Sequence, residues 1–183
     1  MKKIILVFLA ACLAFSFAAC SSKPPVSGGE SGMPREAANA RRNAPEDVLV
    51  GVGTAKLSSL SQSRTLAANR ARQEISFTMD SMVKSMIRDY QASSEVDPAA
   101  ALSFQENISV TLSKSNVNGA VINWEGSDNE GVWWCVVHLS KANVVSEIGQ
   151  AQAAARLAVP AMASFDAEQR MNEAFEQARK EGW

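Results

Sequence analysis

The sequence predicts an α+β fold, in which a small antiparallel sheet of about three strands packs against one long helix and further helices. Three patterns support this prediction: a valine-rich run at residues 47–55, a stripe of apolar residues at helical spacing from Ala68 to Tyr90, and a hairpin pattern at residues 120–139. Residues 46–183 are therefore expected to form a single domain, with a C-terminal helical extension from about residue 151.

Residues 47–55 are short, apolar and bounded by turn-forming residues, which is typical of a buried strand. Gly51 and Gly53 share one face of that strand, so a helix or another backbone can approach it closely. A phosphate-binding loop is the alternative for a Gly-x-Gly pattern. It is disfavoured because a third glycine and a Lys-Ser/Thr pair are both missing from the motif.

The long helix is expected to begin near the serine-rich residues 58–61, which suit a helix cap. Its apolar positions recur every three or four residues and define one buried face: Ala68, Ala71, Ile75, Met79, Met82, Met86 and Tyr90. Core packing is the favoured role of the three methionines, over a soft-metal or ligand-binding strip. The basic residues on the outer side are interpreted as a solvated face: Arg64, Arg70, Arg72, Lys84 and Arg88.

The pair Asp97-Pro98 ends this helix, because a residue before proline avoids helical backbone angles. Residues 104–112 fit a helix through Phe104, Ile108 and Leu112, and they also fit a strand at every second residue. We favour the helix because the polar residues 105–107 are poor strand formers.

A β-hairpin is predicted where residues 120–125 and 132–139 flank a polar loop that begins and ends with glycine. Asp128 and Glu130 in the loop raise the possibility of a calcium site. An ordinary turn is favoured because the alternating oxygen ligands and the distant glutamate of a calcium loop are missing from this stretch.

Two helical segments follow the hairpin. Ser140 is expected to cap the first, which Pro160 interrupts. The second starts near Asp166 and ends before Gly182. Its expected buried face comprises Ala167, Met171, Ala174, Phe175 and Ala178.

Residues 1–19 have the pattern of a secretory signal: two lysines, an apolar run and small residues before a cleavage site. Phe17-Ala18-Ala19-Cys20 resembles the lipobox of bacterial lipoproteins, which implies that the peptide is cut before the cysteine and that acyl chains such as palmitate are attached to Cys20. The stretch that follows, residues 21–45, is rich in Ser, Gly, Pro and charge and is expected to be a flexible tether.

The formal net charge of −1 gives no electrostatic reason to expect nucleic acid or an anionic bilayer as the primary partner. Removal of Cys12 with the signal and acylation of Cys20 leave Cys135 as the free thiol, so an intrachain disulfide is not expected. Cys135 lies in an apolar run without a basic neighbour, which favours a small core residue over a reactive thiol.

No catalytic constellation is recognisable in the sequence, and the single histidine, His138, is interpreted as a satisfied structural residue. Trp124, Trp133 and Trp134 are the candidate partner-binding residues. Because adjacent residues of a strand point to opposite faces, we expect one member of the Trp133-Trp134 pair to enter the core. The other then either binds a partner or is covered by the tether or the terminal helix.

Residues 48–55, 64–72 and 131–140 together resemble the Lpp-twenty family of bacterial surface and outer-membrane lipoproteins, which has relatives in the flagellar basal disk. The shared pattern is a Gly-x-Gly strand end, a helix start rich in Ala and Arg, and a late apolar strand with paired aromatic residues. The resemblance covers about residues 47–148. It implies an antiparallel sheet packed by helices, and established catalytic residues are not part of it.

These observations predict a lipid-anchored envelope protein that is not an enzyme and acts as an interaction or assembly module. Its expected partners are the membrane, through Cys20, and other envelope proteins or further copies; no cofactor, metal or nucleic acid is expected. A component of a flagellar or other envelope assembly is one alternative. The other is a periplasmic carrier that holds a small apolar ligand between the long helix and the sheet. Ser21 favours the outer membrane, because it is not the aspartate associated with retention in the inner membrane.

Overall fold

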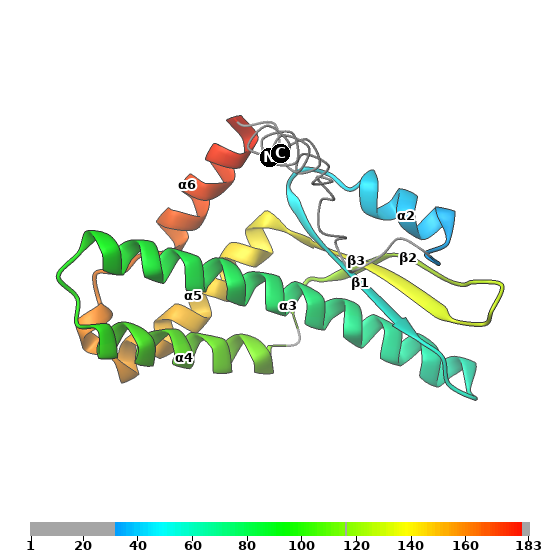
Figure 1. Cartoon of the computed structure of the whole chain (residues 1–183), viewed down its shortest axis with the longest axis horizontal. Helices are drawn as coiled ribbons and strands as arrows, with labels where there is room; N and C mark the ends of the chain where they lie inside the picture. Colours follow the sequence, from blue (N-terminus) through cyan, green and yellow to red (C-terminus); the bar gives the residue numbers. More distant parts are fainter. Residues whose placement is uncertain (1–31, 116, 181–183) are drawn as a thin grey trace, which may run out of the picture. The chain divides into compact units, whose positions relative to one another are not determined.

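The computed structural model describes residues 32–115 and 117–180, which belong to one compact unit that begins at Gly32. Its fold is α+β, as predicted, with a three-stranded antiparallel sheet toward one end of the unit and most of the helices packed together toward the other (Figure 1). The elements in chain order are α2 (Arg35–Arg42), β1 (Val48–Ala55), α3 (Leu60–Ser93), α4 (Pro98–Lys114), β2 (Val121–Ser127), β3 (Trp133–Ser140), α5 (Lys141–Ala158), the 3₁₀ helix η1 (Pro160–Met162) and α6 (Ala167–Lys180).

The sheet has the strand order β1-β3-β2, so the central strand is the last of the three in sequence. β2 and β3 form the predicted hairpin, and β1 pairs with β3 with Gly51 opposite Val137. The β2–β3 register shifts between Ile122 and Trp124, which makes Asn123 the extra residue of a β-bulge. The two edge strands of the sheet are therefore β1 and β2, one on each side of β3.

Helix α3 packs directly on β1 and β3, and the two glycines of β1 make this possible. A Cβ added to Gly51 would collide with the backbone oxygen of Ala71 and lie 2.8 Å from a side-chain carbon of Ile75. A Cβ added to Gly53 would collide with the backbone oxygen of Ala67. The predicted close approach at these glycines is confirmed, and its partner is the backbone of α3.

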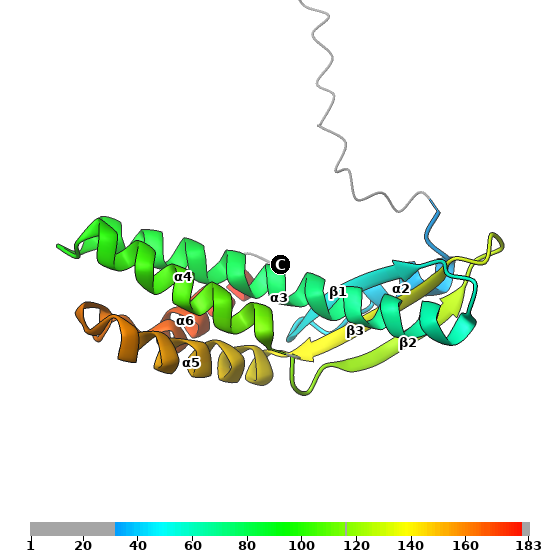
Figure 2. The ribbon, with the colours of Figure 1, turned by 90° about the horizontal axis from the view of Figure 1, so that it is seen from below.

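Helix α3 is longer than the sheet, and its second half packs against helices instead of strands (Figure 2). Ser59 caps its first turn by accepting a hydrogen bond from the backbone of Gln62. The predicted apolar face is buried except for Met82 and Tyr90, which are half-buried. Met79 and Met86 contribute to the core, as expected for methionines at this spacing.

Residues 104–112 are helical, so the helix is the correct choice of the two open interpretations. Pro98 occupies the first turn of α4, and Asp97 caps it through its carboxylate, which accepts from the backbone of Ala99 at 3.3 Å. Phe104 contacts Phe165 edge to face, with ring centroids 5.6 Å apart. This contact ties α4 to the turn before α6.

Helix α5 begins at the predicted cap, Ser140, and ends before Pro160. The predicted start of a C-terminal extension at about residue 151 falls inside this helix, and Ala151 is fully buried. Gln152 is also buried and bonds both sides of the next turn: its amide donates to the Phe165 oxygen at 2.8 Å and accepts from the Ala167 nitrogen at 2.7 Å. The segment after residue 151 is therefore part of the core.

Helix α6 starts after Asp166, as predicted, with the Asp166 carboxylate accepting from the backbone of Gln169 at 3.0 Å. Ala167 and Met171 are buried, in agreement with the predicted apolar face. The predicted helix end at Gly182 lies outside the described residues, and so do the side chains of Ala174, Phe175 and Ala178.

The predicted flexible tether, residues 21–45, differs from the structure at its C-terminal end. Residues Arg35–Arg42 form helix α2, in which Ala37 and Ala38 are buried. Helix α2 packs against β2 and β3, and the sheet lies between it and α3 (Figures 1 and 2). Two small apolar residues were enough to bury one face of a short helix, a signal too weak to distinguish from a linker in sequence.

Candidate partner-binding groove

The three tryptophans predicted to bind a partner are divided between the two faces of the sheet. Trp133 lies on the α3 side and packs partly against the core, beneath the Arg64 guanidinium, which is 5.5 Å from the ring centroid. Trp134 lies on the other face, where its indole donates to the Asp128 carboxylate at 3.1 Å. Trp124 shares that face, and a Cβ on Gly126 would lie only 2.8 Å from its ring. All three are half-buried and do not form one surface.

A groove lies instead along the flank of α3 that faces β2 and the end of α4. Helix α3 covers β1 and β3, and beside it two adjoining hollows of about 600 and 400 Å³ share Asn69 and Arg72. We call this surface the α3 groove. Its lining residues are Ser61, Arg64, Thr65, Ala68, Asn69, Arg72, Gln73, Ser76, Phe77 and Asp80 of α3, Ser109, Val110, Ser113 and Ser115 at the end of α4, and Ile122 and Glu125 of β2.

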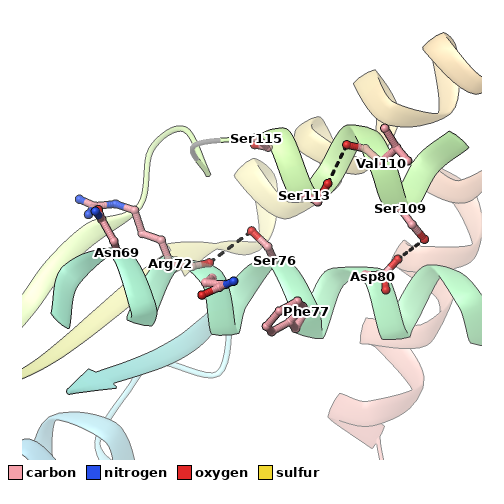
Figure 3. A pocket seen from close by; sticks show the side chains of 10 residues that line it. Asn69, Arg72, Ser76, Phe77, Asp80, Ser109, Val110, Ser113 and Ser115 are labelled. Atoms are coloured by element: carbon pink, nitrogen blue, oxygen red, sulfur yellow. Dashed lines mark hydrogen bonds between the residues drawn. The ribbon is translucent and has the colours of Figure 1, made fainter. Parts of the chain in front are cut away.

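Four of the ten residues that line the larger hollow are serines, and the hydroxyl proton of each is already used in a hydrogen bond (Figure 3). Ser76 donates to the backbone oxygen of Arg72 at 3.3 Å, and Ser113 donates to that of Val110 at 2.9 Å. Ser109 donates to the carboxylate of Asp80. These serines can accept hydrogen bonds from a ligand. Ser76 and Ser113 are bonded to backbone oxygens, and the carboxylate that accepts from Ser109 is itself paired with Lys84, which disfavours its use as a general base.

A buried glutamate fixes the α4 end of the groove. Glu147 of α5 is 7% exposed and accepts from the hydroxyl of Ser115 and from the backbone nitrogen of Asn118, the latter at 3.2 Å. The connection from α4 to β2 is thereby tied to α5, so the wall of the groove at Ser115 is held in place.

The acidic groups of the groove are each paired with a cation. Arg64 and Glu125 form an ion pair across the smaller hollow, and Asp80 pairs with Lys84 at 2.7 Å. Arg72 differs from these residues: it is half-buried, and its guanidinium has no ion pair or hydrogen bond within residues 32–115 and 117–180. The groove therefore presents one uncompensated positive charge near its middle.

Three exposed apolar side chains also line the groove, each on a different element. Phe77 of α3 is 61% exposed, Val110 of α4 is 50% exposed and Ile122 of β2 is 40% exposed. Each lines one of the two hollows. The predicted solvated face is confirmed for Arg64, Arg70 and Arg88, which are exposed, although Arg64 pairs with Glu125 and Arg70 donates to the backbone oxygen of Thr54. Arg72 and Lys84 are half-buried.

Beneath the groove, Cys135 of β3 is fully buried, as expected for a core residue. Burial raises the pKa of its thiol to about 11, and the negative charge of Glu125 acts in the same direction, partly opposed by Arg72. A thiol with this pKa is almost entirely protonated at neutral pH, so it is a poor nucleophile.

The hairpin loop is an ordinary turn built on Asp128. One carboxylate oxygen accepts from the backbone nitrogens of Glu130 and Val132, both at 2.9 Å, and the other accepts from the Trp134 indole. These hydrogen bonds hold the pKa of Asp128 below its usual value, and the bond from Trp134 contributes most. Within the described residues, no three His, Cys, Asp or Glu side chains come together as a metal site.

Two other predicted features have different outcomes. His138 lies on the same face as Trp134, and its Nε2 is buried without a hydrogen-bond partner among the described residues, so it is less satisfied than predicted.

The predicted lipid-attachment site, Cys20, and the predicted signal, residues 1–19, lie outside the described residues. In the part that the structure describes, no helix is long and apolar enough to cross a membrane.

The α3 groove could not be found in the sequence, because its residues come from three elements and most of them are ordinary surface types. A weak signal was present in α3, where the lining positions recur every three or four residues beside the apolar stripe. No protein-family model, curated protein or solved structure matches this chain.

Proposed function

We propose that this protein is a lipid-anchored bacterial envelope lipoprotein, acylated at Cys20, that acts as a non-enzymatic interaction module and binds a protein partner in the α3 groove. The observation that carries the proposal is the groove itself. It is an open surface beside α3 with one unpaired cation and three exposed apolar side chains, in a domain whose other helices are packed against the core.

The anchor rests on the lipobox at residues 17–20 and on the signal-like segment before it. The near-neutral charge of the chain supports attachment through lipid, because electrostatic binding to anionic lipid requires a clustered positive charge. Ser21 supports the outer membrane as the location.

Binding is favoured over catalysis by the chemistry of the groove. Its serine protons are committed to fixed acceptors, its carboxylates are paired with cations, and the nearest thiol has a raised pKa. A reaction site needs a nucleophile or a general acid or base next to a group that activates it. The groove residues instead offer shape, one charge and apolar contacts, which are the features of an interface.

Replacement of Cys20 by alanine tests the anchor. The wild-type chain should incorporate labelled palmitate and fractionate with the outer membrane, whereas the Cys20→Ala variant should incorporate none and move to the soluble fraction. Ser21→Ala is the matched control and should behave as wild type. A Cys20→Ala variant that remains fully in the membrane fraction would exclude lipid anchoring at this residue.

Self-assembly, as in a flagellar or other envelope complex, is the alternative within the same class. Native mass spectrometry of the chain from residue 20 onward separates the two: a monomer at high concentration contradicts assembly from copies, and rings or higher oligomers support it. The carrier alternative needs space between α3 and the sheet. Over β1 the backbone contacts at Gly51 and Gly53 fill that space. Over β2 a hollow of about 400 Å³ remains, but the ion pair of Arg64 and Glu125 crosses it, which suits an apolar ligand poorly.

A further inference from the structure

The two edges of the sheet limit how a partner can bind. At the β1 edge, the backbone nitrogen of Val52 donates to the Glu74 carboxylate, and Arg70 donates to the backbone oxygen of Thr54. At the β2 edge, the bulge at Asn123 interrupts the regular ladder. Capped and bulged edges are devices that prevent pairing with a further strand, so addition of a partner strand to this sheet is disfavoured.

Unlike the two sheet edges, the α3 groove is an open surface that a partner can fill. The lining stretch of α3, from Ser61 to Asp80, is about 28 Å long, which corresponds to about five helical turns. One wall is α3, and the opposite wall is β2 followed by the end of α4. Two adjoining hollows along this length of a helix match a second helix better than a compact small molecule.

The charge of the groove selects the chemistry of that helix. Arg64 is paired with Glu125 and Asp80 with Lys84, which leaves Arg72 as the charged lining residue without an ion pair. Its guanidinium is half-buried, and a carboxylate brought next to it would form a charge-assisted hydrogen bond in a partly desolvated site. The exposed side chains of Ile122 and Val110 lie on the opposite wall, where they can receive apolar residues of the same helix.

We propose that the α3 groove binds an acidic amphipathic helix of another protein, with one carboxylate on Arg72 and apolar side chains against Ile122 and Val110. This proposal rests on the function proposed above and names the kind of partner. The helix lies beside α3 over β2, and the partner is held by side-chain contacts rather than by strand addition.

Site-specific photo-cross-linking in cells tests the proposal with the full chain, including Cys20. The photoreactive residue p-benzoylphenylalanine is placed at Gln73, which is exposed and lines the groove, or at Leu157, which is 87% exposed on α5. The Gln73 probe should capture a peptide of another protein that contains Asp or Glu and has apolar residues at helical spacing. A captured peptide of this same chain, or one without an acidic residue, would overturn the proposal.

The captured peptide is then synthesised, and its binding is measured by fluorescence anisotropy and circular dichroism. Arg72→Glu should raise the Kd at least about 10-fold, and Arg72→Gln should raise it less. The matched control, Arg88→Glu, makes the same charge change at an exposed residue of α3 outside the groove and should leave the Kd unchanged. Replacing the peptide's acidic residue by lysine should restore binding to Arg72→Glu. The peptide should gain helix on binding.

The same Kd for wild type and both Arg72 variants, or binding without a gain of helix, contradicts the proposal. The two probes distinguish this failure from failure of the proposed function. If the Leu157 probe captures a partner and the Gln73 probe does not, the interaction function stands and the groove assignment falls. If neither probe captures a protein, the interaction function falls as well.

Discussion

The two flanks of α3 differ in how they meet the sheet. On the β1 side, the helix backbone rests on Gly51 and Gly53, and Glu74 and Arg70 bond the free edge of the strand. On the β2 side, a hollow separates the helix from the strand, and Ile122 is 40% exposed. The comparison shows that one helix covers two strands of this three-stranded sheet, and that the uncovered third strand creates the groove.

The largest effect is expected from adding a methyl group to the closed flank. Gly51→Ala places a Cβ against the backbone oxygen of Ala71, so α3 must shift as a unit, and we expect a loss of about 3 kcal/mol in the free energy of unfolding. Urea denaturation measures it. Gly149→Ala is the control, because an added Cβ meets nothing within 4 Å in α5 and should be neutral or stabilising. Equal stabilities for the two variants would contradict the close packing at β1.

Removing the cap of the β1 edge should have an intermediate effect. Glu74→Ala leaves the backbone nitrogen of Val52 without its acceptor, which lies at 2.5 Å, and should lower the free energy of unfolding by about 1–2 kcal/mol. Glu74→Gln keeps an acceptor oxygen and should lose less. Hydrogen exchange at the Val52 amide is the specific readout. It should accelerate in Glu74→Ala, and an unchanged rate would show that the carboxylate does not protect this edge.

In the β2–β3 hairpin, replacement of Asp128 should change how the free energy of unfolding depends on pH. Because the folded pKa of Asp128 is lowered from 3.8, its contribution to stability is present above pH 4 and is lost as the pH falls through the lowered value. The free energy of unfolding, measured in urea between pH 2 and 5, should therefore fall less steeply toward acid for Asp128→Asn than for wild type. Parallel curves would mean that the bonds from Trp134 and the turn do not favour the ionised carboxylate.

The smallest effect is expected in the groove. Ile122→Ser should lower the free energy of unfolding by no more than about 1 kcal/mol, because the side chain is already 40% exposed. Its register partner on β3, Val137, is fully buried, and Val137→Ser should cost several times more. Thermal unfolding of the two variants measures the contrast. A comparable loss for Ile122→Ser would indicate that β2 is covered in the folded protein and that the groove is not open.

The sequence alone determined most elements of this fold, because local patterns specify them. Apolar spacing marked α3, Ser140 and Pro160 bounded α5, and two apolar runs around a polar loop marked the hairpin. Asp97-Pro98 marked the break between α3 and α4. The lipobox-like pattern at residues 17–20 is equally local. Acylation of Cys20 remains a prediction.

Only the tertiary structure decided which surfaces are closed and which are open. Helix α2 lies in a stretch whose composition predicts a tether. Its few apolar residues become buried only because the helix packs against β2 and β3, which sequence patterns do not show. Arg70 and Arg72 are two residues apart on one helix, yet one bonds the edge of β1 and the other faces the groove. That difference depends on where α3 crosses the sheet, which is set by long-range contacts at Gly51 and Gly53. Neither composition nor periodicity predicts where α3 crosses the sheet.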